Sequence, residues 1–208
     1  MNKPSLTLYG MKLSGHCHRV EMLLRMLELP FDFVEAPAAV RATPEFRALN
    51  PLGQIPVLTD GELVLCDSAA IMVYLVKRYA PASDWLPADA LRAAATQRWL
   101  AVAAGEVKYG PATARLVSLW NAPGDLAEAR AIAGKLLRFM DEHLAGRRYL
   151  VDGDTPTLAD LACYSYIAHA PEGGIALEPY PAVRAWLERV EALPNFTAMP
   201  RSAPKAAA

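Results

Sequence analysis

The residues with the clearest chemical potential in this chain lie close together, between positions 13 and 18. Ser14, His16, Cys17 and His18 stand where an alternating strand pattern changes to a helical pattern. A metal site on the two histidines is excluded by geometry, because side chains two residues apart on a helix point about 200° apart. No CxxC or HExxH pattern occurs elsewhere in the sequence. Ser14 and Cys17 therefore remain as candidates.

The helical pattern that follows separates these two candidates. Its apolar stripe is formed by Val20, Leu23, Leu24 and Leu27. Cys17 lies three residues before this stripe begins, so it is expected to be a small, partly buried residue that packs beneath the site. Ser14 precedes the helix and can point its hydroxyl toward a ligand. The order Ser-Gly-His-Cys has the spacing of a thioredoxin-type C-x-x-C with serine in the first position.

The first eighty residues predict a small α/β layer. Apolar residues alternate in the strand segments, Pro30 ends the first helix, and Asp60-Gly61 is a pair that tight hairpins prefer. The expected strands are 5–10, 31–35, 54–58 and 62–66, and the expected helices are one ending at Pro30, one over 43–50 and one from Asp67 to about Tyr79. The order is β-α-β, a short helix, then β-β-α.

The character of the chain changes after Tyr79. Residues 81–88 are rich in Pro, Ala and Asp and are predicted to be a linker between a domain at 1–80 and a helical domain at 89–208. The expected helices of the second domain are roughly 88–119, 124–145, 157–170 and 181–193. Within the first of these, Gly105, Gly110 and Pro111 are expected to bend or interrupt the helix. Thr157 and Asp160 have the spacing of a capping box.

Composition narrows the classes of protein further. The chain is 53% hydrophobic and 21% charged, with a formal charge of −1, which is typical of a globular protein with no attraction to nucleic acid or anionic membranes. No uncharged apolar run is long enough to span a membrane, and the first ten residues are too short and polar for a secretory signal. Three widely spaced cysteines favour reduced thiols in the cytoplasm.

Four motifs in this order make the chain similar to the cytosolic glutathione transferases, in particular to bacterial, serine-type members of the beta, delta and theta-like classes. The first is Ser14 at the strand-to-helix turn, and the last is the box from Thr157 to Asp160. Between them, NPLGQIPVL at 50–58 resembles the family's NPxGxVPxL, and DSAAI at 67–71 resembles its ESxAI, with Asp in place of Glu. The resemblance implies an α/β thioredoxin-like N-terminal domain followed by an all-α C-terminal domain.

The resemblance also implies how glutathione is bound. A cis bond at Pro56 would present the backbone of Ile55 to the cysteinyl backbone of glutathione, with Gln54 as a supporting contact. Asp67 and Ser68 open a helix, where free N–H groups favour an anion. There the γ-glutamyl carboxylate would meet the N–H groups and the Ser68 hydroxyl. Asp67 would pair with the ligand ammonium while Ser68 caps the helix.

Ser14 matches the position of a catalytic serine in the family, with Tyr9 as the second choice. A free thiol has a pKa of about 8.5, so about 3% is thiolate at neutral pH. Lowering this pKa by two needs about 2.7 kcal/mol. A hydrogen bond to the charged sulfur supplies about 1.5–3 kcal/mol and a helix N-terminus about 0.3–1 kcal/mol, so one hydroxyl is sufficient.

The second substrate is expected against the first long helix of the helical domain. Trp99, Lys108 and Tyr109 are the candidates for this electrophile pocket, with Arg115 a further side chain of interest. The expected enzyme is a cytoplasmic, homodimeric transferase that adds glutathione to small apolar electrophiles in detoxification, with glutathione as co-substrate and no metal.

Two alternatives remain open at this point. One is a glutathione-dependent thiol-disulfide oxidoreductase that uses Cys17 as nucleophile, and the other is a non-catalytic glutathione-binding protein on the same fold. The sequence also leaves open an isomerase or dehalogenase that uses the same thiolate.

Overall fold

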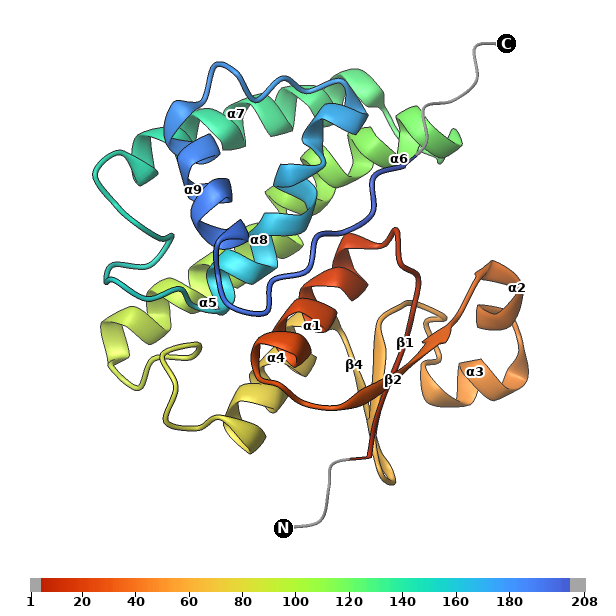
Figure 1. Ribbon diagram of the computed structural model, residues 1–208. Coiled ribbons are helices and arrows are strands. Elements are labelled where there is room, and N and C mark those ends of the chain that lie inside the picture. The colour runs from red at the N-terminus through yellow and green to blue at the C-terminus, as the bar shows by residue number, and fades with distance from the viewer. Residues whose placement is uncertain (1–4, 203–208) are drawn as a thin grey trace. The chain divides into compact units, whose positions relative to one another are not determined.

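The computed structural model describes residues 5–202, which form two compact units (Figure 1). The first unit contains the chain up to Ser83 together with Pro194–Met199, and the second contains Asp84–Leu193 and continues from Pro200. The outer ends of the two expected domains, residues 1–4 and 203–208, lie outside the described residues.

The first unit has the element order that the sequence predicts, with one additional short helix. Its strands are β1 (Leu6–Gly10), β2 (Phe31–Glu35), β3 (Val57–Asp60) and β4 (Leu63–Cys66). Its helices are α1 (Gly15–Met26), α2 (Ala38–Arg41), α3 (Pro44–Leu49) and α4 (Ser68–Tyr79). The short helix α2 was not predicted, because it has four residues, no side-chain cap and no buried residue that would leave a periodic pattern.

The four strands form one mixed sheet in the order β2-β1-β3-β4. β1 pairs with β2 in parallel through the crossover helix α1, and β1–β3 and β3–β4 are antiparallel. In the hairpin, Asp60 pairs with Leu63, so the two turn residues are Gly61 and Glu62 rather than the expected Asp60 and Gly61. The φ of +57° at Gly61 is the conformation for which a hairpin turn favours glycine.

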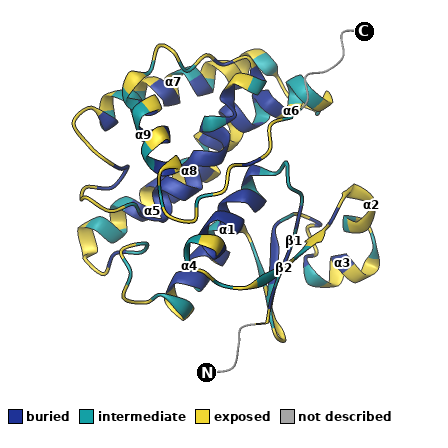
Figure 2. Cartoon of the chain, in the orientation of Figure 1, coloured by how far each residue is buried: buried dark blue, intermediate teal, exposed yellow. Residues whose placement is uncertain are grey.

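Helices cover both faces of this sheet. Leu8 and Leu58 pair across β1 and β3, so they share one face of the sheet, and both are fully buried. Figure 1 shows α1 and α4 next to each other beside the sheet. On the opposite face, Phe46 of α3 packs with Val57 and meets the ring of Tyr9 edge-on at 6.5 Å. Figure 2 shows buried residues along α1 and α4, whereas α2 is largely exposed.

The second unit is helical. Its elements are α5 (Ala90–Ala104), a π-helical segment η1 (Lys108–Ala112), α6 (Thr113–Trp120), α7 (Leu126–Leu144), α8 (Leu158–Ala168), a 3₁₀ segment η2 (Ala170–Gly173) and α9 (Pro181–Glu191). The predicted interruption of the first long helix is confirmed, because α5 is capped at Gly105 and η1 contains Gly110 and Pro111. A Cβ on Gly110 would lie 2.9 Å from the backbone N of Ala133, so α7 approaches the chain closely here.

Asp160 organises the centre of the second unit. It is fully buried, and the predicted capping box with Thr157 is present at the start of α8. Its carboxylate accepts from the backbone N–H of Thr157 at 2.8 Å and of Leu150 at 3.0 Å, and from the indole N–H of Trp186 at 2.9 Å. One side chain thereby joins α8, the loop before it and α9. Burial raises the pKa of Asp160, and these hydrogen bonds oppose that shift.

The segment Pro194–Met199 returns from the helical part of the sequence to the first unit. The Thr197 carbonyl lies 2.8 Å from Nε2 of His18 on α1, and Asn195 donates to Glu28 at 3.2 Å. The sequence prediction placed this segment in the helical domain. Contacts between residues more than 160 positions apart leave no local pattern from which they could be recognised.

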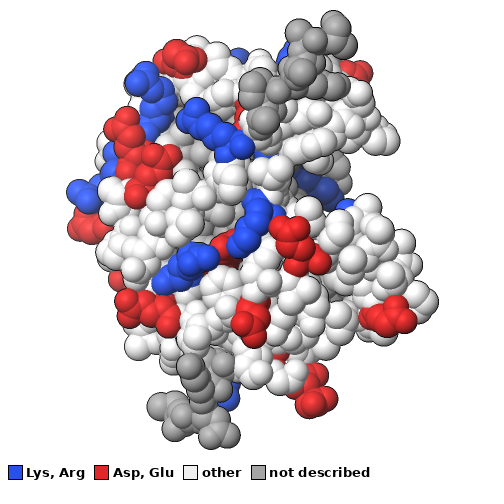
Figure 3. All heavy atoms as spheres, turned by 45° about the vertical axis from the view of Figure 1, so that its right-hand side comes forward, with Lys and Arg blue, Asp and Glu red and all other residues white. Residues whose placement is uncertain are grey.

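The surface reflects the near-balance of charge in the sequence. On the face seen in Figure 3, acidic and basic side chains of the described residues are interspersed. Within residues 5–202, no helix combines the length and apolar character that crossing a membrane requires.

Candidate active site

The register of the sheet brings three predicted site segments to the same edge. Tyr9 of β1 pairs with Val57 of β3, and Val57 pairs with Cys66 of β4. Because β3 runs antiparallel to both neighbours, the end of β1, the start of β3 and the end of β4 coincide. The segments that follow or precede these ends carry Ser14, Ile55-Pro56 and Asp67-Ser68 respectively.

Ser14 is the N-cap of α1. Its backbone is extended (φ −91°, ψ 116°), and its Oγ accepts the backbone N–H of Cys17 at 3.4 Å. The side chain is half-buried at the mouth of the helix. A hydroxyl that accepts through its oxygen still carries a hydrogen that it can donate, and the sulfur of Cys17 is one acceptor within its reach. Ser14 therefore combines a structural cap with a donor at the positive end of α1.

Cys17 lies beneath the site, as its place beside the apolar stripe predicted. Its side chain is 1% exposed, and a Cβ built on Gly10 would come within 2.7 Å of its sulfur. Burial raises the pKa of the Cys17 thiol, and hydrogen bonding to Ser14 offsets only part of that rise. A buried, protonated thiol is a poor nucleophile, so the geometry does not favour redox chemistry at this residue.

Asp67, and not Ser68 as expected, is the residue that caps the start of α4. Asp67 is the N-cap, and its Oδ1 accepts from the backbone N–H of Ala69 at 2.8 Å and of Ala70 at 3.1 Å. Ser68 is the first helical residue and is buried, with Nη1 of Arg19 at 3.4 Å from its Oγ. The prediction that Ser68 caps the helix is wrong, because the φ of +72° at Asp67 turns its carboxylate over the first turn.

The loop before β3 has the predicted cis bond between Ile55 and Pro56. Asn50 organises this loop, since its amide donates to the Gln54 carbonyl at 2.9 Å and its oxygen accepts from the Leu52 N–H at 3.1 Å. Gln54 is exposed and Ile55 is half-buried. These side-chain bonds from Asn50 give the NPxG part of the motif a physical role, which is to shape the loop that precedes the strand.

Arg41 is a charged residue of this region that the sequence pattern does not predict as part of the site. It ends α2 and is half-buried, and its Nη1 donates to the Gly53 carbonyl at 3.4 Å while its Nε is buried with no hydrogen-bond partner in the described part of the chain. Its positive charge lowers the pKa of the Cys17 thiol and so opposes part of the rise that burial causes. Arg41 follows β2 in a stretch that has no alternating or helical periodicity, so the sequence gives no indication that this residue belongs to a site.

The candidates for the electrophile pocket have different environments within the second unit. Trp99 is 1% exposed and stacks on Phe139 at 5.5 Å, so it belongs to the core and is not available to line a pocket. Lys108 and Tyr109 are exposed in η1, with the ammonium 5.1 Å from the ring centroid. Arg115 is buried and pairs with Glu172 at 2.6 Å.

Two further features bear on where a site could lie among the described residues. A shallow pocket of about 570 Å³ lies at the far end of α1 from Ser14, lined by residues that include Arg25, Phe31 and Phe196. Among residues 5–202, no three His, Cys, Asp or Glu side chains gather in a way that could hold a metal ion. The polar groups at the sheet edge therefore remain the best candidate site.

Comparison with known proteins agrees with this fold and identifies its family. Residues 8–83 match the model of the glutathione S-transferase N-terminal domain, and residues 121–194 match that of the glutathione S-transferase C-terminal domain. Glutathione S-transferase 3 of Zea mays is 37% identical, over 92% of this chain and 91% of the relative.

Solved structures extend the agreement to three dimensions. A glutathione S-transferase from Xanthobacter autotrophicus has a TM-score of 0.84 at 33% identity, covering 94% of this chain and 97% of that one. A theta class glutathione S-transferase from Xanthomonas axonopodis pv. citri, solved with glutathione bound, has a TM-score of 0.80 at 29% identity, covering 92% and 95%. The chain belongs to the glutathione S-transferase family, and it is a transferase enzyme that uses glutathione.

Proposed function

We propose that this protein activates glutathione through the hydroxyl of Ser14 and adds the resulting thiolate to small, apolar electrophiles. The observation that carries the proposal is the position of Ser14, half-buried as the N-cap of α1 at the edge where three site segments converge. The nucleophile then belongs to the substrate and not to the protein. The alternative nucleophile, Cys17, is buried and has a raised pKa.

The same edge offers a complementary partner for each polar group of glutathione. The γ-glutamyl carboxylate would meet the N-terminus of α4 and the Ser68 hydroxyl, and its ammonium would meet the Asp67 carboxylate. The backbone of Ile55, next to Pro56, would pair with the cysteinyl backbone, with Gln54 beside it. Arg41 would neutralise the glycyl carboxylate, since its guanidinium reaches the Gly53 carbonyl in the loop before Ile55-Pro56 and its buried Nε has no hydrogen-bond partner among the described residues.

Catalysis would consist of activation and placement. The Ser14 O–H donates a hydrogen bond to the sulfur and stabilises its anionic form, and the dipole of α1 acts in the same direction. Together they supply about 1.8–4 kcal/mol, which lowers the thiol pKa by about 1.3–2.9 from a starting value of about 8.5. The thiolate then attacks an electrophile held beside it, with no general base required.

Further properties complete the proposal. Lys108 and Tyr109 are the remaining candidates for contact with the electrophile, being exposed side chains of a helical break. We place the enzyme in the cytoplasm, as a homodimer that acts in detoxification. Three cysteines without a disulfide among them suit a reducing compartment.

Substitution of Ser14 tests the central step and can separate catalysis from capping. Ser14→Ala removes the hydroxyl and the cap, whereas Ser14→Gly removes the hydroxyl at a cost of only a few tenths of a kcal/mol in helix stability. Both should raise the pKa of bound glutathione and reduce kcat/KM for a generic aryl halide by about tenfold or more at pH 6.5. Ser14→Thr, which keeps a hydroxyl, is the matched control.

The two variants must agree for the proposal to stand. Equal losses of kcat/KM in Ser14→Ala and Ser14→Gly would assign the effect to the missing hydroxyl. Normal activity in Ser14→Gly would show that another group activates the thiol and would overturn the proposal.

A further inference from the structure

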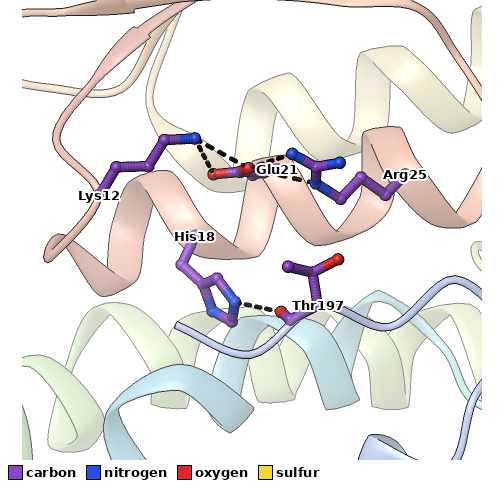
Figure 4. Close-up of polar contacts among 5 residues, drawn as sticks. All are labelled: Lys12, His18, Glu21, Arg25 and Thr197. Atoms are coloured by element: carbon purple, nitrogen blue, oxygen red, sulfur yellow. Dashed lines mark hydrogen bonds and ion pairs between the residues drawn. The ribbon is translucent and has the colours of Figure 1, made fainter. Parts of the chain in front are cut away.

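The loop that carries Ser14 is held by a side chain that lies outside the site itself. Residues 11–14 connect β1 to α1, and the Ser14 N–H donates to the Met11 carbonyl at 3.0 Å, which closes a tight turn. Lys12 stands in the middle of this turn. As Figure 4 shows, its side chain extends from the loop along α1 and ends at Glu21.

The ammonium of Lys12 has three contacts in two other elements. It donates to Oε1 of Glu21 at 3.0 Å and to Oε2 at 3.1 Å, and it lies 3.6 Å from the ring centroid of Phe33 on β2. Glu21 is the seventh residue of α1, so its backbone lies about 9 Å along the helix from the first residue of α1, and the Lys12 and Glu21 side chains bridge this distance together. The loop is thereby joined to α1, the helix that follows it, and to β2, the strand that pairs with β1.

The receiving carboxylate is itself fixed. The side chain of Glu21 is 9% exposed, and Arg25 holds it from the other side with Nη2 at 2.7 Å and Nε at 3.2 Å (Figure 4). Burial alone would raise the pKa of Glu21, but the hydrogen bonds from Arg25 and Lys12 outweigh it and hold that pKa below its ordinary value. Glu21 is therefore an ionised, immobile point of attachment.

The geometry points to Lys12 as a positioning residue for the thiolate-activating hydroxyl, and we propose this role. The inference rests on the proposed function of Ser14. Lys12 lies two residues before Ser14, and its ammonium is already committed to Glu21 and Phe33. It acts by keeping the turn in one conformation, so that the Ser14 O–H stays aligned with the substrate sulfur. Alignment matters because hydrogen bonds weaken steeply once their angle departs from linearity.

A different explanation would be that Lys12 stabilises the thiolate by its charge, and the two make opposite predictions for Glu21. If charge were the cause, Glu21→Gln would leave Lys12 and Arg25 without their counter-ion and would lower the pKa of bound glutathione further. If positioning is the cause, Glu21→Gln loosens the same attachment and raises that pKa, as Lys12→Met does. The direction of the change in Glu21→Gln separates the two.

The experiment measures the thiolate absorbance of saturating glutathione on each variant across pH, together with kcat and KM for an aryl halide. Lys12→Met should raise the pKa of bound glutathione by about 0.5–1 and reduce kcat at pH 6.5 by about 3–10-fold, since each pKa unit is a factor of ten in thiolate. KM for glutathione should change by less than about twofold, because Lys12 does not touch it. Lys12→Arg keeps the ion pair and should restore most of the activity.

Controls distinguish failure of this inference from failure of the proposed function. Lys77→Met removes an exposed lysine of α4 and should leave every value unchanged. If Ser14→Ala raises the pKa of bound glutathione but Lys12→Met does not, the role of Lys12 is wrong and that of Ser14 stands. If Ser14→Ala leaves that pKa unchanged, the proposed function fails first. A lower thiol pKa in Glu21→Gln would overturn positioning in favour of charge.

Discussion

Asp67 is proposed to do two things at once, and a single substitution separates them. Its Oδ1 caps α4 by accepting two backbone N–H groups at 2.8 and 3.1 Å, and its charge is available to the ammonium of glutathione. Asp67→Asn keeps a side-chain oxygen for the cap, because Asn and Asp are equally good N-cap residues. Asn also tolerates the positive φ of 72° at this position. The variant therefore removes the charge and little else.

The expected magnitudes differ for the two functions. Loss of a carboxylate from a helix N-terminus costs about 0.3–1 kcal/mol of stability, so the thermal midpoint of Asp67→Asn should fall only slightly. Replacing a charge-assisted hydrogen bond with a neutral one costs about 1 kcal/mol, and solvent around this exposed residue keeps the cost near that value. Glutathione should therefore bind about 3–10-fold more weakly to Asp67→Asn.

The assay is calorimetric titration of both proteins with glutathione and with an analogue that lacks the γ-glutamyl amino group. The analogue should bind the wild-type protein about as weakly as glutathione binds Asp67→Asn, and the substitution should not weaken it further. An equal loss of affinity for both ligands in Asp67→Asn would mean that the carboxylate acts through the helix and not through the ammonium, and would refute the proposed contact.

Three other predictions concern stability and reactivity. Asp160→Ala leaves buried N–H donors of the second unit, among them the Trp186 indole, without their acceptor, so unfolding in urea should show a loss of about 3 kcal/mol or more. Cys17 should resist a charged thiol reagent in the native protein while Cys66, which is half-buried, reacts first; peptide mapping of the labelled protein measures the order. Gly110→Ala should lower the thermal midpoint, because its Cβ would meet the backbone of α7 at 2.9 Å.

Much of the first unit is predictable because its signals are local. Alternation located β2 at Phe31–Glu35, and the Asp67-Ser68 pair located the start of α4. The position of Ser14 before α1 follows from the helical periodicity that begins after it. Resemblance to the family supplied the cis bond at Pro56, which propensity alone would not have distinguished from an ordinary strand-edge proline.

Prediction was weaker where a residue's role depends on what packs against it. Trp99 and Arg115 occupy a helical region that suggested a pocket, but both are buried in the second unit. Arg41 gave no signal, since the short helix α2 that presents it has no periodic pattern. A residue type and its spacing do not determine whether a side chain faces a core, a partner or solvent.

The local sequence pattern was therefore sufficient to predict the elements of the first unit other than α2, their order along the chain, and Ser14 as the candidate donor. Tertiary structure alone decided which of the distant side chains meet. The pairing of β1 with β3 and β3 with β4 gathers the site at one edge, and folding brings Lys12 onto Glu21, nine residues away, and Thr197 onto His18, 179 residues away. Periodicity records which face of an element is apolar, but the partner on that face is selected only when the elements pack.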